Sequence, residues 1–241
     1  MSTPEDGPPR PPSADPAPAP PGPVRREREL LAAALLEAGP DAPTRCAGWD
    51  ARDLTAHLVV RERRPDAAPG ILLPPLAFYT ERVRRRTARS VPFDRLVDRF
   101  RHGPPKLSPY ALPGVDKSAN AVEFFVHHED VRRARPDWEP RDLSGELEEL
   151  LWKRIKIARF VLRKVHVEVT LVQPDGRSLR VSGGGRGAPR GPRGASRGPV
   201  RVHGPVGELV LWTLGRGDVA KVRLTGATEA VKSLTETGWT L

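Results

Sequence analysis

The chain has 241 residues, which is enough to bury a real core in one large domain or two small ones. Its formal net charge is +10, which would suit an acidic partner. However, only 7 of its 40 basic residues are lysines, a bias that nucleotide composition can produce without nucleic-acid binding. The single cysteine, Cys46, excludes an internal disulfide and fits a reducing cytoplasm.

Membrane insertion and secretion are not indicated. No apolar run approaches the roughly 18 residues of a spanning helix, and the N-terminus lacks the basic start and apolar core of a secretory signal. We therefore expect a cytoplasmic protein.

Residues 1–23 hold 10 of the 28 prolines, so we expect a disordered tail there, with a proline-rich docking peptide as the alternative.

Helical periodicity dominates the next part of the chain. Asp50 suits the N-cap of one helix, with Asp53 at its third position. Apolar spacing and breaker residues predict helices at Arg25–Ala38, Ala51–Arg64, Ile71–Arg89, Phe93–Arg101, from about Ser118 to Ala134, and Glu146–Val161.

After this point the pattern changes to alternation. It predicts strands at Val165–Val172, Arg177–Val181, Val200–His203 and Val219–Leu224, and helices at Pro205–Leu214 and Thr228–Thr237. Residues 182–199 contain seven glycines, four arginines and three prolines, which predicts a flexible loop. We therefore expect a helical domain at 24–163 and a smaller α/β domain at 164–241.

The stretch from Ala119 to Ala134 reads ANAVEFFVHHEDVRRA and carries an unusual polar stripe. On a helix, four polar side chains fall within about 80° of one another, with apolar neighbours on both sides: Asn120, Glu123, His127 and Asp130. The far face is expected to meet solvent through Glu129 and Arg132, with His128 and Arg133 at its edges. A stripe of this kind indicates a carboxylate and an imidazole that point inward and need a partner.

A second histidine also points inward by its helical phase. His57 lies between Leu54 and Val60 in angle, although Arg61 shares that side. The opposite side is expected to hold Arg52, Thr55, Val59, Glu62 and Arg63. An inward histidine such as His57 is more often a hydrogen-bonded core residue than a metal ligand. The spacing of Glu123 and His127 is also compatible with a buried Glu–His hydrogen bond or with a solvated helix face.

Together, His57, Glu123 and His127 suit a divalent metal. Two imidazoles and one carboxylate leave coordination positions open, as in catalytic zinc sites, and the same donors serve non-haem iron. Asp130, one turn from His127, could orient that imidazole, or could pair with Arg133 at the surface. His128 is rotated by about 100° from His127 and is not expected to be a ligand.

Two other kinds of site are less well supported. Cys46 precedes Gly48-Trp49 in a loop, and no sequence feature places a base beside it for nucleophilic catalysis. The loop at 182–199 is similar in composition to Gly/Arg-rich RNA-binding tails through Arg186, Arg190, Arg193 and Arg197. It lacks the interleaved aromatic residues of such tails, so nucleic-acid binding is not favoured.

Two motifs carry a family resemblance: TRCAGWDARDLTAHLVVRERRPDAAPG and NAVEFFVHHEDVRRA. There the chain resembles the mycothiol-dependent maleylpyruvate isomerase-like proteins of the DinB helical superfamily, and within them an uncharacterised metal-binding subgroup. The resemblance extends over about Val24 to Leu241. It implies an N-terminal DinB-like four-helix bundle whose divalent metal, for which we expect zinc, is held by His57, Glu123 and His127.

The resemblance also concerns the second half of the chain. The segment GPVGELVLWTLGRGD is similar to the signature of a small sterol-carrier-protein-like α/β domain. Arg216 matches an arginine that lies near the active site in the isomerase, and we expect it to be catalytic by binding a substrate carboxylate; a helix-capping cation is the alternative. The family implies mycothiol as cofactor, with its sulfur activated at the metal.

The sequence thus predicts a metal-dependent isomerase or S-transferase that uses a small-molecule thiol and an electrophilic or carboxylate substrate. A non-catalytic metal-binding or sensing protein is the first alternative, and nucleic-acid binding through the basic loop is the second. No motif indicates the oligomeric state.

Overall fold

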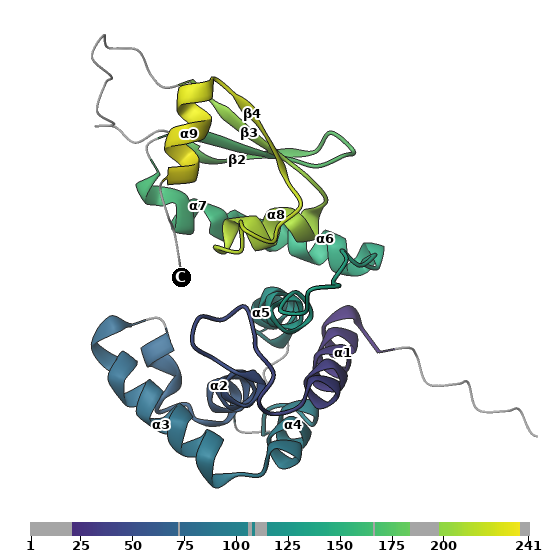
Figure 1. The fold of residues 1–241 in the computed structure, drawn as a ribbon, viewed down its shortest axis with the longest axis vertical. Coiled ribbons are helices and arrows are strands. Elements are labelled where there is room, and N and C mark those ends of the chain that lie inside the picture. Colours follow the sequence, from purple (N-terminus) through teal and green to yellow (C-terminus); the bar gives the residue numbers. More distant parts are fainter. Residues whose placement is uncertain are drawn as a thin grey trace, which may run out of the picture.

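The computed structural model describes residues 21–71, 73–105, 108, 115–165, 167–183 and 198–236. Most of the predicted tail at 1–23 and most of the predicted loop at 184–197 therefore lie outside the described residues. The described part is an α+β structure in which helices form the lower half of Figure 1 and a small sheet with further helices forms the upper half. Within it, every helix is too short or too polar to cross a lipid bilayer.

The helices of the helical half occur in the predicted order, but several of them begin or end at other residues than predicted. Its α-helices are α1 (Pro23–Ala38), α2 (Ala51–Arg63), α3 (Ala77–Ser90), α4 (Phe93–Arg101) and α5 (Val115–Arg132). The predicted start of the third helix at Ile71 is wrong, because the 3₁₀ turns η1 (Ala68–Ile71) and η2 (Pro74–Leu76) precede α3. Prolines in these turns lack the N–H that an α-helix needs in its interior.

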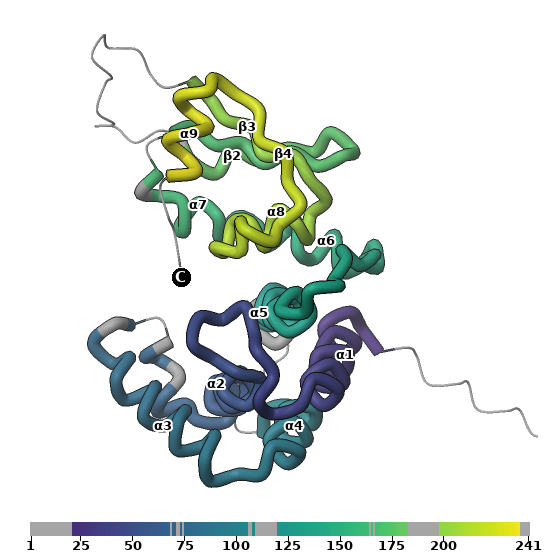
Figure 2. Tube along the Cα trace, in the orientation of Figure 1, coloured from purple at the N-terminus to yellow at the C-terminus, as the bar shows by residue number. Residues whose placement is uncertain are grey.

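Four of these helices supply most of one apolar core, and α3 packs on α2 and adds Ala88 to it (Figure 2). The core is made by α1, α2, α4 and α5, through fully buried side chains that include Leu31, Leu35, Leu54, Leu58, Leu96, Phe100 and Phe124. The rings of Phe100 and Phe124 meet edge to face with centroids 5.3 Å apart, a favoured arrangement of aromatic pairs.

The upper half is built on a four-stranded sheet with the order β2-β1-β3-β4. Its strands are β1 (Glu168–Val172), β2 (Ser178–Gly183), β3 (Val200–His203) and β4 (Arg223–Gly226). β1 pairs with β2 and β3 pairs with β4 in antiparallel fashion, while β1 and β3 run parallel. The predicted loop start at Ser182 is wrong, because Ser182 and Gly183 belong to β2.

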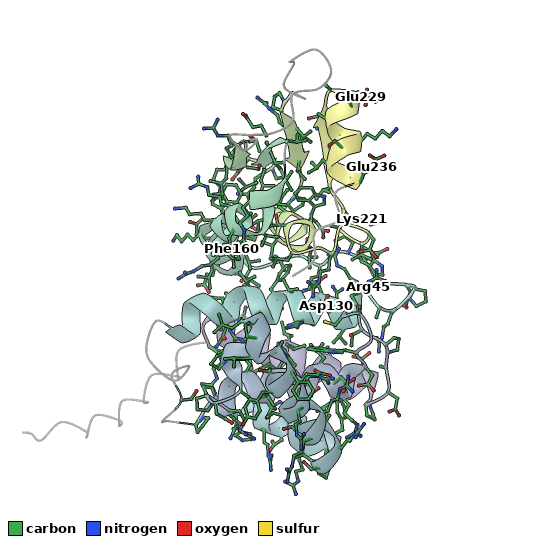
Figure 3. All side chains as sticks on the ribbon, turned by 90° about the vertical axis from the view of Figure 1, so that its left-hand side faces the viewer. Arg45, Asp130, Phe160, Lys221, Glu229 and Glu236 are labelled. Atoms are coloured by element: carbon green, nitrogen blue, oxygen red, sulfur yellow. The ribbon has the colours of Figure 1, made fainter. Side chains whose placement is uncertain are left out.

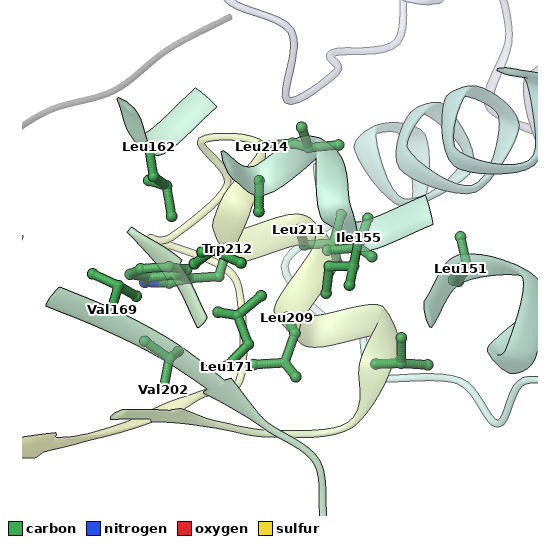
Figure 4. Packing of buried hydrophobic residues seen from close by; sticks show 14 of the residues in the cluster. Leu151, Ile155, Leu162, Val169, Leu171, Val202, Leu209, Leu211, Trp212 and Leu214 are labelled. Atoms are coloured by element: carbon green, nitrogen blue, oxygen red, sulfur yellow. The ribbon is translucent and has the colours of Figure 1, made fainter. Parts of the chain in front are cut away.

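Among the described residues, four helices pack with the sheet: α6 (Gly145–Arg154), α7 (Ala158–Val161), α8 (Val206–Thr213) and α9 (Thr228–Glu236). Helices α6, α7 and α8 lie between the sheet and the helical half, whereas α9 lies beside the strands (Figure 1). The 3₁₀ turn η4 (Ile155–Ile157) joins α6 to α7, and η5 (Leu162–Lys164) follows, so the predicted continuous helix at Glu146–Val161 is interrupted. Figure 4 shows the resulting core, in which Trp212 and Leu209 of α8 pack against Val169 and Leu171 of β1.

Helix α5 is shared by the two cores. Phe124 belongs to the core of the helical half, whereas Phe125 packs with the sheet and its helices. Helix α8 approaches α5 closely at Gly207, where an added Cβ would lie 2.9 Å from the Phe125 ring. Only glycine fits this contact without displacement.

Because α5 is covered on both sides, most of its predicted solvent face is buried, although Arg132, which was also expected there, keeps 27% of its side chain exposed. Glu129 is 1% exposed, and His128 and Arg133 are also buried. Helical periodicity predicts which residues share a face of α5, but it cannot predict the second layer that packs on that face. Helix α2 shows the same effect: Thr55, Val59 and Glu62 were expected to face outward and are buried.

The buried leucines of α6, Leu147 and Leu151, belong to the core of the sheet half, whereas Leu150 packs against the core of the helical half. Helix α6 nevertheless precedes the predicted domain boundary near Arg163. Buried ion pairs also connect the halves, since Arg133 of the segment after α5 pairs with Glu208 of α8 at 2.6 Å. The division into domains at 24–163 and 164–241 therefore stays a prediction.

Candidate metal centre

The capped start of α2 sets the position of the first histidine. Asp50 accepts a hydrogen bond from the backbone N–H of Asp53 at 2.7 Å, which confirms the predicted N-cap. The Asp53 carboxylate pairs with Arg84 of α3 at 2.5 Å, which ties α2 to α3. His57, two turns into α2, faces α5.

The side chains of His57, Glu123 and His127 converge between α2 and α5. His57 Nε2 lies 3.1 Å from Glu123 Oε1, and His127 Nε2 lies 3.4 Å from the same oxygen. The two imidazole rings are 5.4 Å apart between centroids. One donor atom from each of the three residues lies within 4.8 Å of the others.

The distances between these donors suit a shared ion. Ligands about 2.1 Å from one metal lie about 3.0 Å apart at octahedral and about 3.4 Å apart at tetrahedral angles. The two measured separations from Glu123 Oε1, 3.1 and 3.4 Å, fall at these values. The three side chains are 12%, 24% and 12% exposed, so solvent or a ligand can reach the group.

The charges around the group favour an ionised carboxylate. Burial opposes ionisation of Glu123, but hydrogen bonds from His127 and His57 and the charge of Arg61 hold its pKa well below the ordinary value. Burial lowers the pKa of His57, which keeps that imidazole neutral. Burial also disfavours a charged His127, but its hydrogen bonds to Asp130, Cys46 and Glu123 raise its pKa well above the ordinary value.

Asp130 lies behind His127, on the side away from Glu123. Its Oδ2 is 2.9 Å from His127 Nδ1, and its side chain is fully buried. In the neutral tautomer, with Nδ1–H directed at this carboxylate, the Nε2 lone pair of His127 would face Glu123. The raised pKa of His127 means that a metal would have to displace the Nε2 proton to bind there. Burial disfavours ionised Asp130, but its hydrogen bonds to His127 and Arg216 hold its pKa well below the ordinary value.

Arg216 reaches Asp130 from the sheet half of the molecule. Its Nε and Nη2 donate to the two carboxylate oxygens at 3.0 and 2.8 Å, and its Nη1 donates to the Leu214 carbonyl at 2.7 Å. The end of α8 sets this position: Gly215 has φ +84°, and the N–H of Arg216 bonds the Leu211 carbonyl at 2.9 Å. These are features of a Schellman motif.

Cys46 belongs to the same cluster, which sequence reasoning did not anticipate. Its Sγ lies 3.1 Å from Asp130 Oδ2 and 3.7 Å from His127 Nδ1. The loop between α1 and α2 brings it there, since the N–H of Arg45 bonds the Asp130 carbonyl at 2.9 Å. Figure 3 shows Arg45 and Asp130 close together at the level where the two halves meet. Helical phase carries no information about such a loop.

Cys46, His127 and Asp130 also lie close enough to be considered as a second set of metal ligands. Asp130, however, already accepts two hydrogen bonds from Arg216. The His57 set is therefore the better candidate, because within the described residues the one arginine paired with its carboxylate is Arg61, whose Nε lies 3.4 Å from Glu123 Oε1.

The residues that were considered as alternatives lie elsewhere. His128 points away from the group and bonds Glu27 of α1, with Nδ1 2.8 Å from the carboxylate. Arg133 pairs with Glu129 and Glu208, so the surface pairing with Asp130 that the sequence left open is not formed.

Comparison with known protein families supports the resemblance for the first part of the chain. Residues 22–108 match the family model described as Mycothiol maleylpyruvate isomerase N-terminal domain. This confirms the family resemblance. The match contains Cys46 and His57, whereas Glu123, His127 and Arg216 follow it in the chain. No curated protein and no solved structure matches the chain significantly.

Proposed function

We propose that the chain binds a divalent metal through His57, Glu123 and His127 and uses it in a mycothiol-dependent isomerase or S-transferase reaction. The observation that carries this proposal is the approach of both Nε2 atoms to one oxygen of Glu123, at 3.1 and 3.4 Å. The family match over residues 22–108 supplies the link to mycothiol. Zinc suits these donors best among common metals without redox chemistry.

The protein's own groups would act mainly by orientation. Asp130 holds the Nδ1–H of His127, so that Nε2 could bind the metal once the metal has displaced its proton. Glu123 supplies the negative charge, and neutral His57 supplies the second nitrogen. The remaining coordination positions would be open to a thiol sulfur or a water molecule, whose pKa a bound divalent ion lowers.

Arg216 fits a positioning role better than the substrate-binding role that the resemblance suggested. Its Nε and Nη2 are engaged by Asp130 and its Nη1 by a backbone carbonyl. To bind a substrate carboxylate with its fork, Arg216 would have to break both of its hydrogen bonds to the buried Asp130, which would keep only its contacts with His127 and Cys46. Removing a charged partner from a buried carboxylate is costly. We infer that it acts on the metal centre through Asp130 and His127.

The fold-level expectations are part of the same proposal. A core made by α1, α2, α4 and α5 supports a DinB-like four-helix bundle, and a sheet with helices around it supports a sterol-carrier-protein-like domain. Under this proposal the metal centre belongs to the bundle, and the second domain contributes Arg216.

A direct experiment is to load the protein with zinc and measure turnover of maleylpyruvate with mycothiol, and of a general electrophile with the same thiol. We expect thiol-dependent turnover that His57→Ala abolishes. The exposed histidine variant His102→Ala serves as the control, since His102 is 69% exposed and lies outside the group.

A non-catalytic metal-binding or sensing role is the alternative. The ion pair between Arg61 and Glu123 favours it, because a guanidinium beside the carboxylate repels a bound cation and so weakens metal affinity, as reversible metal sensing requires. Stoichiometric zinc without turnover of either substrate would support this role and contradict the enzyme proposal.

A further inference from the structure

A second candidate binding site lies in a groove between α2 and α3. The groove has a volume of about 480 Å³, and five arginines from α2, the α2 C-cap, α3 and α4 line it without any carboxylate: Arg63, Arg64, Arg82, Arg86 and Arg99. An adjoining hollow of about 400 Å³ shares Ser90, Val91 and Arg99 with it and adds Arg95 and Asp98. The groove and the metal centre have no lining residue in common.

The charges of this groove are largely uncompensated. Arg64 pairs with Asp66 at 2.7 Å, but no carboxylate of the described residues pairs with Arg82, Arg86 or Arg99. The rest of α3 differs, because Arg84 and Arg85 both pair with Glu81. Clustered like charges repel one another, and a bound anion would relieve that repulsion.

One of the arginines has an unsatisfied buried donor. Arg63 Nη2 donates hydrogen bonds to the carbonyl oxygens of Arg99 and Gly103, at 3.0 and 2.7 Å. These carbonyls are neutral, so they do not balance the positive charge of Arg63. Its Nε is buried and has no hydrogen-bond partner within the described part of the chain. An unsatisfied buried donor is uncommon and points to a missing acceptor.

The remaining lining shows what shape of ligand would fit. The apolar part consists of Val59, Val60, Val83 and Val91, and Thr87 and Ser90 add hydroxyl groups. A volume of this size is typical of small-molecule sites. Arg82 and Arg86 are one helical turn apart, so both guanidinium groups can reach one anionic group or two linked ones.

We propose that this groove binds a small organic polyanion, with its phosphate or carboxylate groups on the arginines and its apolar body on the valines. A nucleic-acid strand fits less well, because single-strand binding relies on stacking aromatic rings. Among the residues that line the groove, Tyr79 alone is aromatic, and its hydroxyl donates a hydrogen bond to Asp66 at 2.6 Å.

Titration calorimetry at low salt tests the proposal with pyrophosphate and citrate as separate probes, so that phosphate and carboxylate ligands are distinguished. The variant is Arg82→Gln with Arg86→Gln. The matched control is Arg85→Gln with Arg89→Gln, which removes the same charge from the same helix outside the groove. All four arginines are exposed, so the fold should persist, and circular dichroism checks this.

We expect wild-type protein to bind at least one probe, and the groove variant to lose about 10-fold or more in affinity, as the loss of charge-assisted hydrogen bonds implies. The control should change by less than about 3-fold, the size of an exposed charge effect. Equal losses in both variants, or no binding of either probe, would overturn the proposal. So would tighter, groove-dependent binding of a short single-stranded DNA.

Discussion

At the scale of single residues, the proposed metal centre depends on a chain of contacts that begins outside it. Arg216 holds both oxygens of Asp130, and Asp130 holds Nδ1 of His127. Each contact fixes the next side chain, so the direction of the His127 Nε2 atom is set from the sheet half of the molecule. Partners of this kind commonly matter for metal affinity although they do not touch the ion.

We predict that Asp130→Asn lowers zinc affinity by about 10- to 100-fold, the usual effect of losing such a partner. Arg216→Gln should lower it in the same direction, because Asp130 loses its fixed position. If the two residues act in series, the double variant will be no weaker than Asp130→Asn alone. Competition with a chelator measures all three, and strictly additive losses would contradict the positioning role.

At the scale of elements, helical phase predicted which residues of α2 and α5 face one another, and His57, Glu123 and His127 do lie together. It could not predict that a second layer covers the far face of α5 and buries Glu129 there, because periodicity describes one helix and not the layers around it. Cys46 and Arg216 were beyond its reach for a related reason: a loop and a helix end bring them to Asp130.

The burial of α5 creates a polar network that phase analysis assigned to solvent. Arg141, in the segment after α5, donates to Glu129 at 2.7 Å and to Glu27 of α1 at 3.0 Å. Both carboxylates are 1% exposed. Burial disfavours the ionised form of both carboxyl groups. Hydrogen bonds from His128 and Arg141 nevertheless hold the pKa of Glu27 below its ordinary value. Hydrogen bonds from Arg141 and Arg133 do the same for the pKa of Glu129.

We predict that Arg141→Gln lowers the free energy of unfolding by about 2 to 4 kcal/mol at pH 7, since it leaves buried carboxylates short of a partner. A carboxyl group whose pKa is lowered by folding stabilises the fold fully at pH values above its unfolded pKa of about 4.3. This stabilisation is lost as the pH falls through the lower pKa of the folded state. The deficit of the variant should therefore shrink below about pH 4. Urea unfolding across this range measures it.

The matched control for that experiment is Arg135→Gln. Arg135 forms an exposed pair with Glu37, in which the side chains are 51% and 69% exposed. Pairs of this kind contribute about 0 to 1 kcal/mol. A loss for Arg141→Gln that is no larger than the control's, or that persists unchanged in acid, would contradict the role assigned to the network.

At the scale of the whole molecule, the two halves meet through α5 and a small number of buried charges. Arg133 donates to Glu208 at 2.6 Å and to the Val219 carbonyl at 2.7 Å, while Arg216 crosses to Asp130. The change from helical to alternating periodicity predicted an α+β chain correctly. The contacts between the halves follow from tertiary packing, and they place an arginine of the second half beside the metal centre of the first.

The proposed function requires that His57, Glu123 and His127 bind one ion together. Native mass spectrometry with metal quantification tests this on the wild-type chain, His57→Ala, His127→Ala and the exposed control His102→Ala. We predict one divalent ion per wild-type and control chain, and a loss of stoichiometric metal in the other two variants while circular dichroism shows a retained fold. A wild-type chain that stays metal-free when zinc is supplied, or a His57→Ala chain that keeps its full complement, would contradict it.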